Sequence, residues 1–227
     1  MKQVRTQKKH IHAHVSTEWV FRFWAWQLLF WALYRYFFHL PEWADEFVFK
    51  PLVFVVPVFL YVLKKERSRL ISIGLTKKNL SKNLLFGMGM GIIFFLEGIG
   101  VNIATNGTLK IQQLSTVAGY SVGLLTLLSL ATAFSEEVLS RGFLFSRLYA
   151  QTKRLWYSIL LSTAMFVAFH IPILVTSLKF QGPTLILFVA TSVVLAIVNS
   201  IIFVQSKSLV TPILIHFFWN MTVALFL

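Results

Sequence analysis

Six polar side chains interrupt the apolar stretches of this sequence and are of types that can do chemistry together. They are, in chain order, Glu136, Glu137, Arg141, His170, His216 and Asn220. A carboxylate buried in a membrane is costly, so residues of this kind usually mark a functional site or a pathway. Carboxylates, histidines and an amide are also groups that activate water and stabilise an oxyanion. These residues therefore predict an intramembrane hydrolase.

The two carboxylates are expected to do different work. Glu137 and Arg141 are four residues apart, so they share a helix face and can form an ion pair. Glu136 is rotated by about 100° from Glu137 and points elsewhere. We expect Arg141 to hold Glu137 in its charged form, and Glu136, in a drier setting, to take and return a proton.

The histidines and the asparagine complete two alternative mechanisms. In the first, Glu136 with His170 polarises a water molecule, and His216 and Asn220 donate hydrogen bonds to the developing oxyanion. In the second, Glu136, His170 and His216 hold Zn²⁺, whose bound water attacks. These residues do not establish a cofactor, and zinc is the candidate.

The elements that must position these residues are helices in a membrane. The chain is 57% hydrophobic and only 13% charged, with a mean hydropathy of +0.73, whereas soluble domains are about 25% charged. A helical crossing needs about 20 apolar residues. Seven stretches approach or exceed that length: 19–40, 46–63, 83–104, 117–146, 156–178, 184–204 and 208–227. The sequence predicts an all-α, polytopic membrane helical bundle of about seven to eight transmembrane helices.

The depths of the polar residues agree with one another. If the helix that carries Glu136 continues to Arg147, Glu136 lies about 16 Å from the cytoplasmic interface at 1.5 Å per residue. The same count places His170 about 21 Å, His216 about 12 Å and Asn220 about 18 Å from that interface. All four are therefore expected in one slab near the middle of the membrane.

The net charge of +13 comes mainly from basic residues just outside the apolar stretches. Such residues set orientation and meet anionic lipid headgroups, so the charge favours a lipid bilayer and not nucleic acid as the partner. The positive-inside rule predicts a multi-pass protein of the cell membrane with a cytoplasmic N-terminus and an external C-terminus. The chain has no cysteine, which excludes thiolate ligands and a cysteine nucleophile.

Other charged residues in the apolar stretches have simpler interpretations. Arg22 and Arg35 lie near the ends of the first stretch, and we expect their charges to reach the interface by snorkelling. Lys50 is interpreted in the same way. Glu97 lies deep in the third stretch, and no basic residue is nearby in the sequence. Two interpretations remain open: Glu97 lines the site, or it pairs with an arginine elsewhere in the chain.

Small and amide side chains predict helix packing. Gly87, Gly89 and Gly91 lack the preceding strand and the following lysine of a nucleotide loop. Glycines four apart in an apolar helix, here Gly87 and Gly91, instead permit close helix packing. Asn102 and Asn199 are expected to form hydrogen bonds between helices.

The chemically active residues resemble a known family. The successive motifs are Glu136-Glu137-x-x-x-Arg141, Phe166-x-x-x-His170 and Ser208-Leu-Val-Thr-Pro212-Ile-Leu-Ile-His216-x-x-x-Asn220. In this order they resemble the CPBP family, also called the Abi family, of type II CAAX prenyl proteases and bacteriocin-processing or immunity proteins. One departure is the turn Gln205-Ser-Lys-Ser208, where the family usually has a glycine-containing element.

The resemblance covers roughly residues 117–227 and implies that this segment is an intramembrane protease core. Residues 1–18 are then a basic cytoplasmic tail, and 19–116 are variable N-terminal transmembrane helices. The implied reaction is hydrolysis of a peptide bond in a membrane-associated protein or peptide. The resemblance favours a water activated by glutamate over a water bound to a metal. A non-catalytic immunity or scaffold protein on the same fold is the alternative. A proton-coupled transporter is a third hypothesis, although the sequence has no repeated half.

Overall fold

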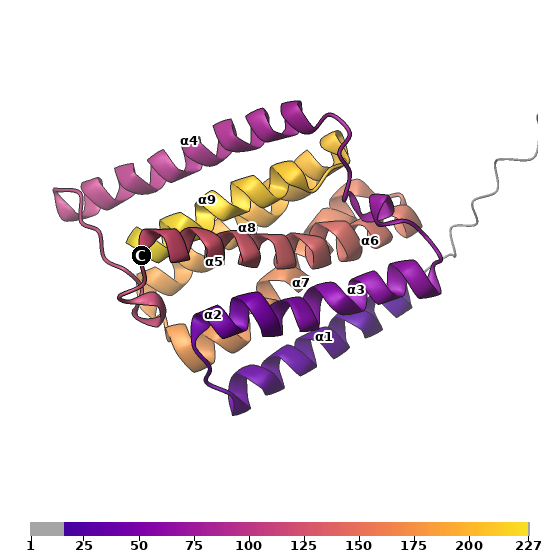
Figure 1. The fold of residues 1–227 in the computed structure, drawn as a ribbon, viewed down its shortest axis with the longest axis horizontal. Coiled ribbons are helices and arrows are strands. Elements are labelled where there is room, and N and C mark those ends of the chain that lie inside the picture. The colour runs from indigo at the N-terminus through magenta and orange to yellow at the C-terminus, as the bar shows by residue number, and fades with distance from the viewer. Residues whose placement is uncertain (1–15, 227) are drawn as a thin grey trace, which may run out of the picture.

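The computed structural model describes residues 16–226, and every regular element within them is a helix (Figure 1). The predicted basic tail therefore lies outside the described residues, except for its last three positions. The long helices are α1 (Thr17–Phe37), α4 (Leu80–Asn106), α8 (Gly182–Ser206) and α9 (Val210–Phe226), together with three composite segments: Glu42–Lys65, Val122–Thr152 and Leu155–Leu178. The predicted all-helical bundle is confirmed.

The composite segments contain π-helical turns. Glu42–Lys65 consists of α2 (Glu42–Ala44), η1 (Asp45–Phe49), η2 (Pro51–Val55), α3 (Val56–Leu60) and η3 (Tyr61–Lys65). Val122–Thr152 consists of α5 (Val122–Glu137), η6 (Val138–Phe145) and α6 (Ser146–Thr152), and Leu155–Leu178 consists of α7 (Leu155–Ile173) and η7 (Leu174–Leu178). Two short 3₁₀ turns, η4 (Leu70–Ile73) and η5 (Ser115–Val117), lie in connections. The irregular turns follow partly from Pro51, Pro57 and Pro172, which lack an amide hydrogen.

Five of these segments are long and apolar enough to cross a membrane by length and composition: Glu42–Lys65, α4, Val122–Thr152, Leu155–Leu178 and α8. The chain is thus a multi-pass membrane protein. Each of the seven stretches expected from the sequence overlaps one long helical segment, although the edges differ. For the stretch expected at 117–146, the helical segment begins at Val122 and continues to Thr152. Glu136 therefore lies within a continuous helical segment, as expected.

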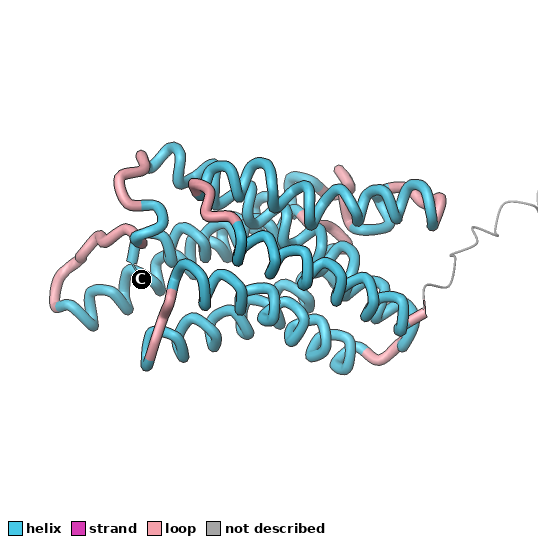
Figure 2. The backbone as a smooth tube through the Cα atoms, turned by 90° about the horizontal axis from the view of Figure 1, so that it is seen from below, coloured by secondary structure: helices cyan, strands magenta, loops and turns pink. Residues whose placement is uncertain are grey.

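The helices run side by side and roughly antiparallel, with α1 and α4 at opposite edges and α7 and α8 behind α5 and α9 (Figures 1 and 2). One end of the bundle collects the 107–121 connection, the start of α2 and the C-terminal end of α9 (Figure 1). The other end collects η4, the end of α6 and the start of α4. This arrangement brings the middle of α5 between Glu42–Lys65 on one side and α9 on the other.

Helix α4 packs against α9 through two glycines that are four residues apart, as expected. A Cβ atom at Gly91 would lie 2.2 Å from Cδ2 of Phe218, and one at Gly87 would lie 2.9 Å from Cδ1 of Leu214. The packing prediction is therefore confirmed for Gly87 and Gly91. A Cβ at Gly89 would meet nothing within 4 Å, because Gly89 lies on another face of the helix.

The segment η6 directly follows the adjacent glutamates, and all eight of its residues are buried. Glycine is needed within it because a Cβ at Gly142 would lie 3.0 Å from the carbonyl oxygen of Ile73. The η4 turn contacts η6 and is followed by Gly74, whose φ of 84° is in the left-handed region that glycine favours. This turn therefore packs directly against the segment that carries Arg141.

Candidate active site

The adjacent glutamates end α5 near the middle of the Val122–Thr152 segment and face different surroundings. Glu137 is fully buried, whereas Glu136 is 9% exposed and lines a cavity. The difference follows from the rotation of about 100° between neighbouring helical residues. The expectation that the two carboxylates have different surroundings is confirmed. The expectation that Glu136 lies in the drier setting is wrong, because Glu137 is the more buried of the two.

Glu137 is the centre of a buried hydrogen-bond network that joins three helical segments. Its Oε1 atom accepts hydrogen bonds from Nη1 of Arg141 at 2.9 Å, Nδ2 of Asn199 at 3.0 Å and Nδ1 of His216 at 2.8 Å. Asn199 also donates to the carbonyl oxygen of Pro212 at 3.1 Å. The expected Glu137–Arg141 ion pair and the expected interhelical role of Asn199 are confirmed. Glu137 thereby fixes both the position and the orientation of the His216 ring.

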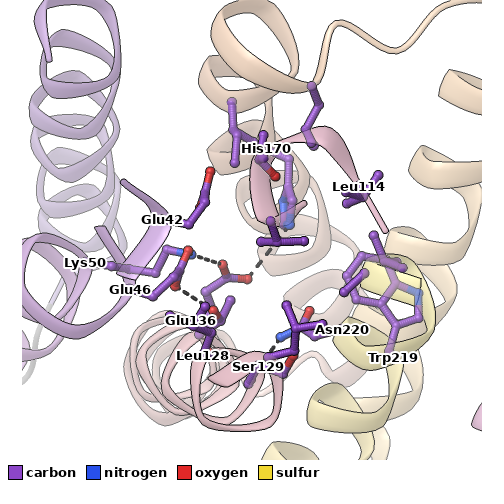
Figure 3. Close-up of a pocket in the computed structure, with 18 of the residues that line it drawn as sticks. Glu42, Glu46, Lys50, Leu114, Leu128, Ser129, Glu136, His170, Trp219 and Asn220 are labelled. Carbon is purple, nitrogen blue, oxygen red and sulfur yellow. Dashed lines mark hydrogen bonds and ion pairs between the residues drawn. The ribbon is translucent and has the colours of Figure 1, made fainter. Parts of the chain in front are cut away.

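Glu136 lies between a lysine and two histidines. Its Oε1 atom accepts a hydrogen bond from Nζ of Lys50 at 3.0 Å (Figure 3). Its Oε2 atom lies 3.8 Å from Nε2 of His170 and 3.6 Å from Nε2 of His216. The expectation that Lys50 snorkels to the interface is wrong: the side chain is buried and pairs with a carboxylate 86 residues away.

Lys50 belongs to a second buried network, which sequence reasoning missed. Nζ of Lys50 also donates to Oε1 of Glu46 at 2.6 Å, and Oε2 of Glu46 accepts from the hydroxyl of Thr132 at 2.5 Å. A signal was present in the sequence, because Glu46 and Lys50 are four residues apart, as Glu137 and Arg141 are. Glu136 therefore joins the N-terminal helices to the remainder of the site.

Arg35 also differs from its expected role. The side chain of Arg35 is buried and forms an ion pair with Asp45. The hydroxyl of Tyr34 also contacts Asp45, and Nη2 of Arg35 donates to the hydroxyl of Ser177 at 2.5 Å. The expectation that Arg35 snorkels to the interface is wrong, because the start of the Glu42–Lys65 segment covers it. Arg22 is exposed and pairs with Glu18, so the snorkelling interpretation remains only for Arg22.

A cavity of about 140 Å³ extends from Glu136 toward the 107–121 connection. His170 and Asn220 also line it, and Nδ2 of Asn220 donates to the carbonyl oxygen of Ser129 at 3.1 Å (Figure 3). Most of the other lining side chains are apolar, including Trp219. The cavity thus combines polar groups at its inner end with an apolar wall.

The two histidines are held differently. His170 is largely buried, and its Nδ1 atom lies 3.1 Å from the carbonyl oxygen of Phe166, so Nε2 is the atom available to Glu136. His216 is fully buried and does not line the cavity. Because Nδ1 of His216 donates to Glu137, Nε2 is an acceptor when the ring is neutral and a donor only when the ring is protonated. Nε2 of His216 lies 3.6 Å from Oε2 of Glu136, and Glu136 does line the cavity.

The zinc alternative requires Glu136, His170 and His216 to act as three ligands of one ion. Among residues 16–226, no group of three or more histidines and acidic residues is arranged to hold a metal ion. The ammonium group of Lys50, 3.0 Å from Oε1 of Glu136, would also repel a cation at this carboxylate. The residues present do not fit a bound zinc ion in this arrangement.

Two other polar residues lie away from the site. Glu97 is exposed on α4 and does not line the cavity, and none of the ion pairs among the described residues includes it. Asn102 accepts a hydrogen bond at its Oδ1 atom from the amide of Lys110, at 2.8 Å. The expectation that Asn102 bonds to another helix is therefore wrong, because its partner is the connection that follows α4.

Comparison with known proteins agrees with the motifs. The family model described as type II CAAX prenyl endopeptidase Rce1-like matches residues 118–222. A search of the curated proteins and a search of the solved structures found no match. All six polar residues singled out in the sequence lie within the matched range, whereas Lys50 and Glu46 lie outside it. Residues 118–222 of the chain therefore match the Rce1-like family of type II CAAX prenyl endopeptidases.

Proposed function

We propose that the chain is an intramembrane endopeptidase that hydrolyses a peptide bond of a membrane-associated protein or peptide. The observation that carries this proposal is the position of Oε2 of Glu136, within 4 Å of Nε2 of both His170 and His216. This oxygen forms no hydrogen bond to residues 16–226, and Glu136 lines a cavity that a substrate can occupy. The family match supports the same reaction class.

In the proposed reaction, Oε2 of Glu136 accepts a proton from a water molecule that Nε2 of His170 also contacts. The water oxygen attacks the carbonyl carbon of the scissile bond, and negative charge develops on the carbonyl oxygen. Asn220, which lines the cavity, donates a hydrogen bond to that oxygen. Glu136 then returns the proton to the amine as the carbon–nitrogen bond breaks. Water and peptide are thereby converted to an acid and an amine.

Glu137 and Arg141 have positioning roles in this proposal. The carboxylate of Glu137 fixes the ring of His216, and the guanidinium of Arg141 balances the charge of Glu137 at 2.9 Å. The guanidinium also lies over the ring of Phe166 at 4.5 Å, one helical turn before His170. These contacts join α9, η6 and α7, so they set the relative position of the two histidines.

We further propose that all seven long helical segments cross the membrane of the cell, with the N-terminus in the cytoplasm. Residues 19–116 and 117–227 then form one catalytic unit, because Lys50 of the first part contacts Glu136 of the second. Helix α9 has only 17 residues, about 26 Å at 1.5 Å per residue, so it spans the hydrocarbon core only with little tilt.

The variant Glu136→Gln tests the proposal because it keeps the shape of the side chain and removes the base. Membrane peptides from cells that express the native chain or the variant would be compared by mass spectrometry. We expect a peptide that is cut only by the native chain. Glu97→Gln is the matched control, since the same change is made on the exposed face of α4. An unchanged peptide pattern in cells with Glu136→Gln, at equal protein level, would refute the proposal.

A non-catalytic immunity or scaffold protein is the second candidate. The observation that favours it is the burial of His216 and Lys50, because a packed ion network also stabilises a helix bundle without catalysis. The two candidates differ in what Glu136→Gln does to protection of a producing cell against its peptide. A scaffold retains protection, whereas a protease loses every effect that depends on cleavage.

A further inference from the structure

Helix α4 forms one edge of the bundle and is largely uncovered (Figures 1 and 2). Its main partner among the described elements is α9, which packs along one side of it. In the most apolar 18 residues of α4, 11% of the residues are buried, against 33% to 44% in the other four apolar spans. The outer side of α4 therefore meets lipid unless another molecule covers it.

The exposed carboxyl group of Glu97 lies on this outer side, at a depth within the lipid layer. Glu97 is nine residues from the end of α4 at Asn106, which is about 14 Å at 1.5 Å per residue. Helix α4 is about 40 Å long and the hydrocarbon core is about 30 Å thick, so Glu97 lies about 9 Å inside a core centred on the helix. A carboxyl group at that depth is costly unless it is neutral or paired with a cation.

Neither interpretation that the sequence leaves open accounts for Glu97. The side chain does not line the cavity beside Glu136. The buried guanidinium groups of Arg35 and Arg141 are paired with other carboxylates, and none of the ion pairs among residues 16–226 includes Glu97. Since the described part of the chain supplies no counter-ion, a partner for this carboxyl group comes from a second molecule.

One turn after Glu97, Gly100 allows another helix to approach closely. The neighbouring Gly98 faces inward, where a Cβ atom would lie 2.2 Å from Cγ2 of Thr222, so the missing side chain is needed for packing against α9. A Cβ atom at Gly100 would meet nothing within 4 Å. Glycine weakens a helix relative to alanine, and no contact within the described chain compensates for it at Gly100. A small residue on a lipid-facing surface suits the close approach of a second transmembrane helix.

A second copy of the chain offers no exposed cation at the depth of Glu97. At the nearer end of the bundle, the exposed cations among the described residues are Lys110 and Lys179, and both lie in connections beyond the helix ends. Two copies related by a two-fold axis along the membrane normal keep each residue at its own depth, so Glu97 meets the second copy's Glu97. A neutral carboxyl group has one donor and an acceptor, so two such groups exchange two O–H···O hydrogen bonds. The side chain is therefore complementary to itself.

We propose that a second copy of this chain docks on the outer face of α4, with the two Glu97 carboxyl groups hydrogen-bonded to each other beside Gly100. The candidate active site is complete within one copy, because Glu136, His170 and Asn220 line a cavity of a single chain. The inference is thus independent of the proposed reaction, and its failure would leave the protease proposal standing.

The chain contains no cysteine, so a single introduced cysteine reports the contact by disulfide formation. Ile93→Cys lies on the outer face of α4, one turn before Glu97, at a position that is 60% exposed. Val194→Cys on α8 is the matched control, at a position that is 51% exposed. Ile93 is 13 residues from the end of α4 and Val194 is 12 residues from the start of α8, at the same end of the bundle (Figure 1). Membranes from cells that express each full-length variant would be oxidised with copper phenanthroline.

We expect Ile93→Cys to give at least fivefold more disulfide-linked homodimer than Val194→Cys, with the product identified by mass spectrometry. The control measures random collisions of two copies at the same depth in the membrane. Equal amounts of dimer from the two variants, or no dimer from Ile93→Cys, would overturn the proposal.

The role of the carboxyl group would be measured in the Ile93→Cys chain. Glu97→Gln supplies an amide, which both donates and accepts, and should retain the dimer. Glu97→Leu has a similar size without a polar group and should lower the yield of dimer at least fivefold. Thermal unfolding of both variants in detergent should stay native, because residue 97 is exposed within each chain. A native yield of dimer from Glu97→Leu would show that the carboxyl group does not hold the two copies together.

A basic helix of another protein is the alternative partner for Glu97. The probe for it would be a leucine-rich transmembrane peptide of about 20 residues with one central lysine and one cysteine. It would be added to membranes that contain the Ile93→Cys chain. A disulfide with this peptide, and none with a second chain, would assign the outer face of α4 to a basic helix and overturn the assignment to a second copy.

Discussion

Nζ of Lys50 lies 3.0 Å from Oε1 of Glu136, and this contact joins a helix outside the matched family range to the proposed base. The same ammonium group lies 2.6 Å from Oε1 of Glu46, so one cation is shared by two buried carboxylates. With Lys50 on Oε1, the other oxygen of Glu136 is the one directed to the histidines. In the proposed reaction, Lys50 therefore balances charge and leaves Oε2 as the oxygen that acts as the base.

The first prediction concerns this lysine. Lys50→Met should lower the rate of peptide cleavage at least tenfold and should destabilise the protein, because loss of one partner of a buried ion pair costs about 3–5 kcal/mol. Lys50→Arg keeps the charge and should retain more activity than Lys50→Met. Cleavage rate and thermal unfolding in detergent measure the two effects. Native cleavage by Lys50→Met would show that the contact has no role in the reaction.

The second prediction separates charge balance from orientation at Glu137. Arg141→Met and Glu137→Gln each break the buried pair and should each lower stability by about 3–5 kcal/mol. Only Glu137→Gln removes the carboxylate that holds His216, 2.8 Å away. The pH profile of cleavage should therefore change in Glu137→Gln and stay native in the folded fraction of Arg141→Met. Identical profiles for the two variants would contradict the positioning role of Glu137.

The third prediction concerns the amide at the inner end of the cavity. Asn220→Ala should lower the cleavage rate about 100- to 1,000-fold, the usual effect of removing one oxyanion donor. Substrate binding and protein level should change little. Asn106→Ala is the matched control, since Asn106 is exposed at the end of α4. A large change in substrate affinity without a change in the rate of bond cleavage would instead assign Asn220 to binding.

The fourth prediction concerns metal. Because Glu136 is already paired with Lys50, we expect purified active protein to contain far less than one zinc ion per chain. Cleavage should also persist in the presence of 1,10-phenanthroline. Zinc at one ion per chain, together with activity that is lost on chelation and restored by Zn²⁺, would support the metal mechanism in place of the glutamate mechanism.

Much of the helical arrangement follows from the sequence because apolar length and helical spacing are local properties. The Glu137–Arg141 pair is within one helix, and its spacing predicts it directly. Arg35 and Lys50 show where this reasoning ends. Their buried positions depend on which helix covers them, and a contact such as Lys50–Glu136 spans 86 residues. The position of a residue along its helix predicts its depth in the membrane. That position does not predict which side chains of neighbouring helices the residue contacts.

The burial of His216 also depends on contacts between helices, which the sequence does not predict. The spacing of His216 and Asn220 predicts a shared helix face, yet Asn220 lines the cavity and His216 does not. Nε2 of His216 lies 3.6 Å from Oε2 of Glu136, which lines the cavity, and Nδ1 is held by Glu137 on the other side of the ring. The sequence shows that these groups lie at similar depth, but it does not show their order from the cavity inward.

The last prediction tests whether the site depends on the packing of α4 against α9. A Cβ atom at Gly91 would lie 2.2 Å from Cδ2 and 2.9 Å from Cγ of Phe218, so the ring or the helix must move. Gly91→Ala should therefore lower the free energy of unfolding by about 1–3 kcal/mol, the usual cost of overpacking. Because Phe218 lies between His216 and Asn220 in α9, a shift of this helix should also lower the cleavage rate.

Gly89→Ala is a closely matched control for this prediction. It is the same substitution two residues away in the same helix, and its Cβ would meet nothing within 4 Å. Alanine also favours a helix over glycine by about 0.5–1 kcal/mol, so Gly89→Ala should be neutral or slightly stabilising. Thermal unfolding in detergent and cleavage by the two variants would be measured in parallel. If both variants behave alike, α4 does not pack against α9 through Gly91, and the position of α9 in the site does not depend on that contact.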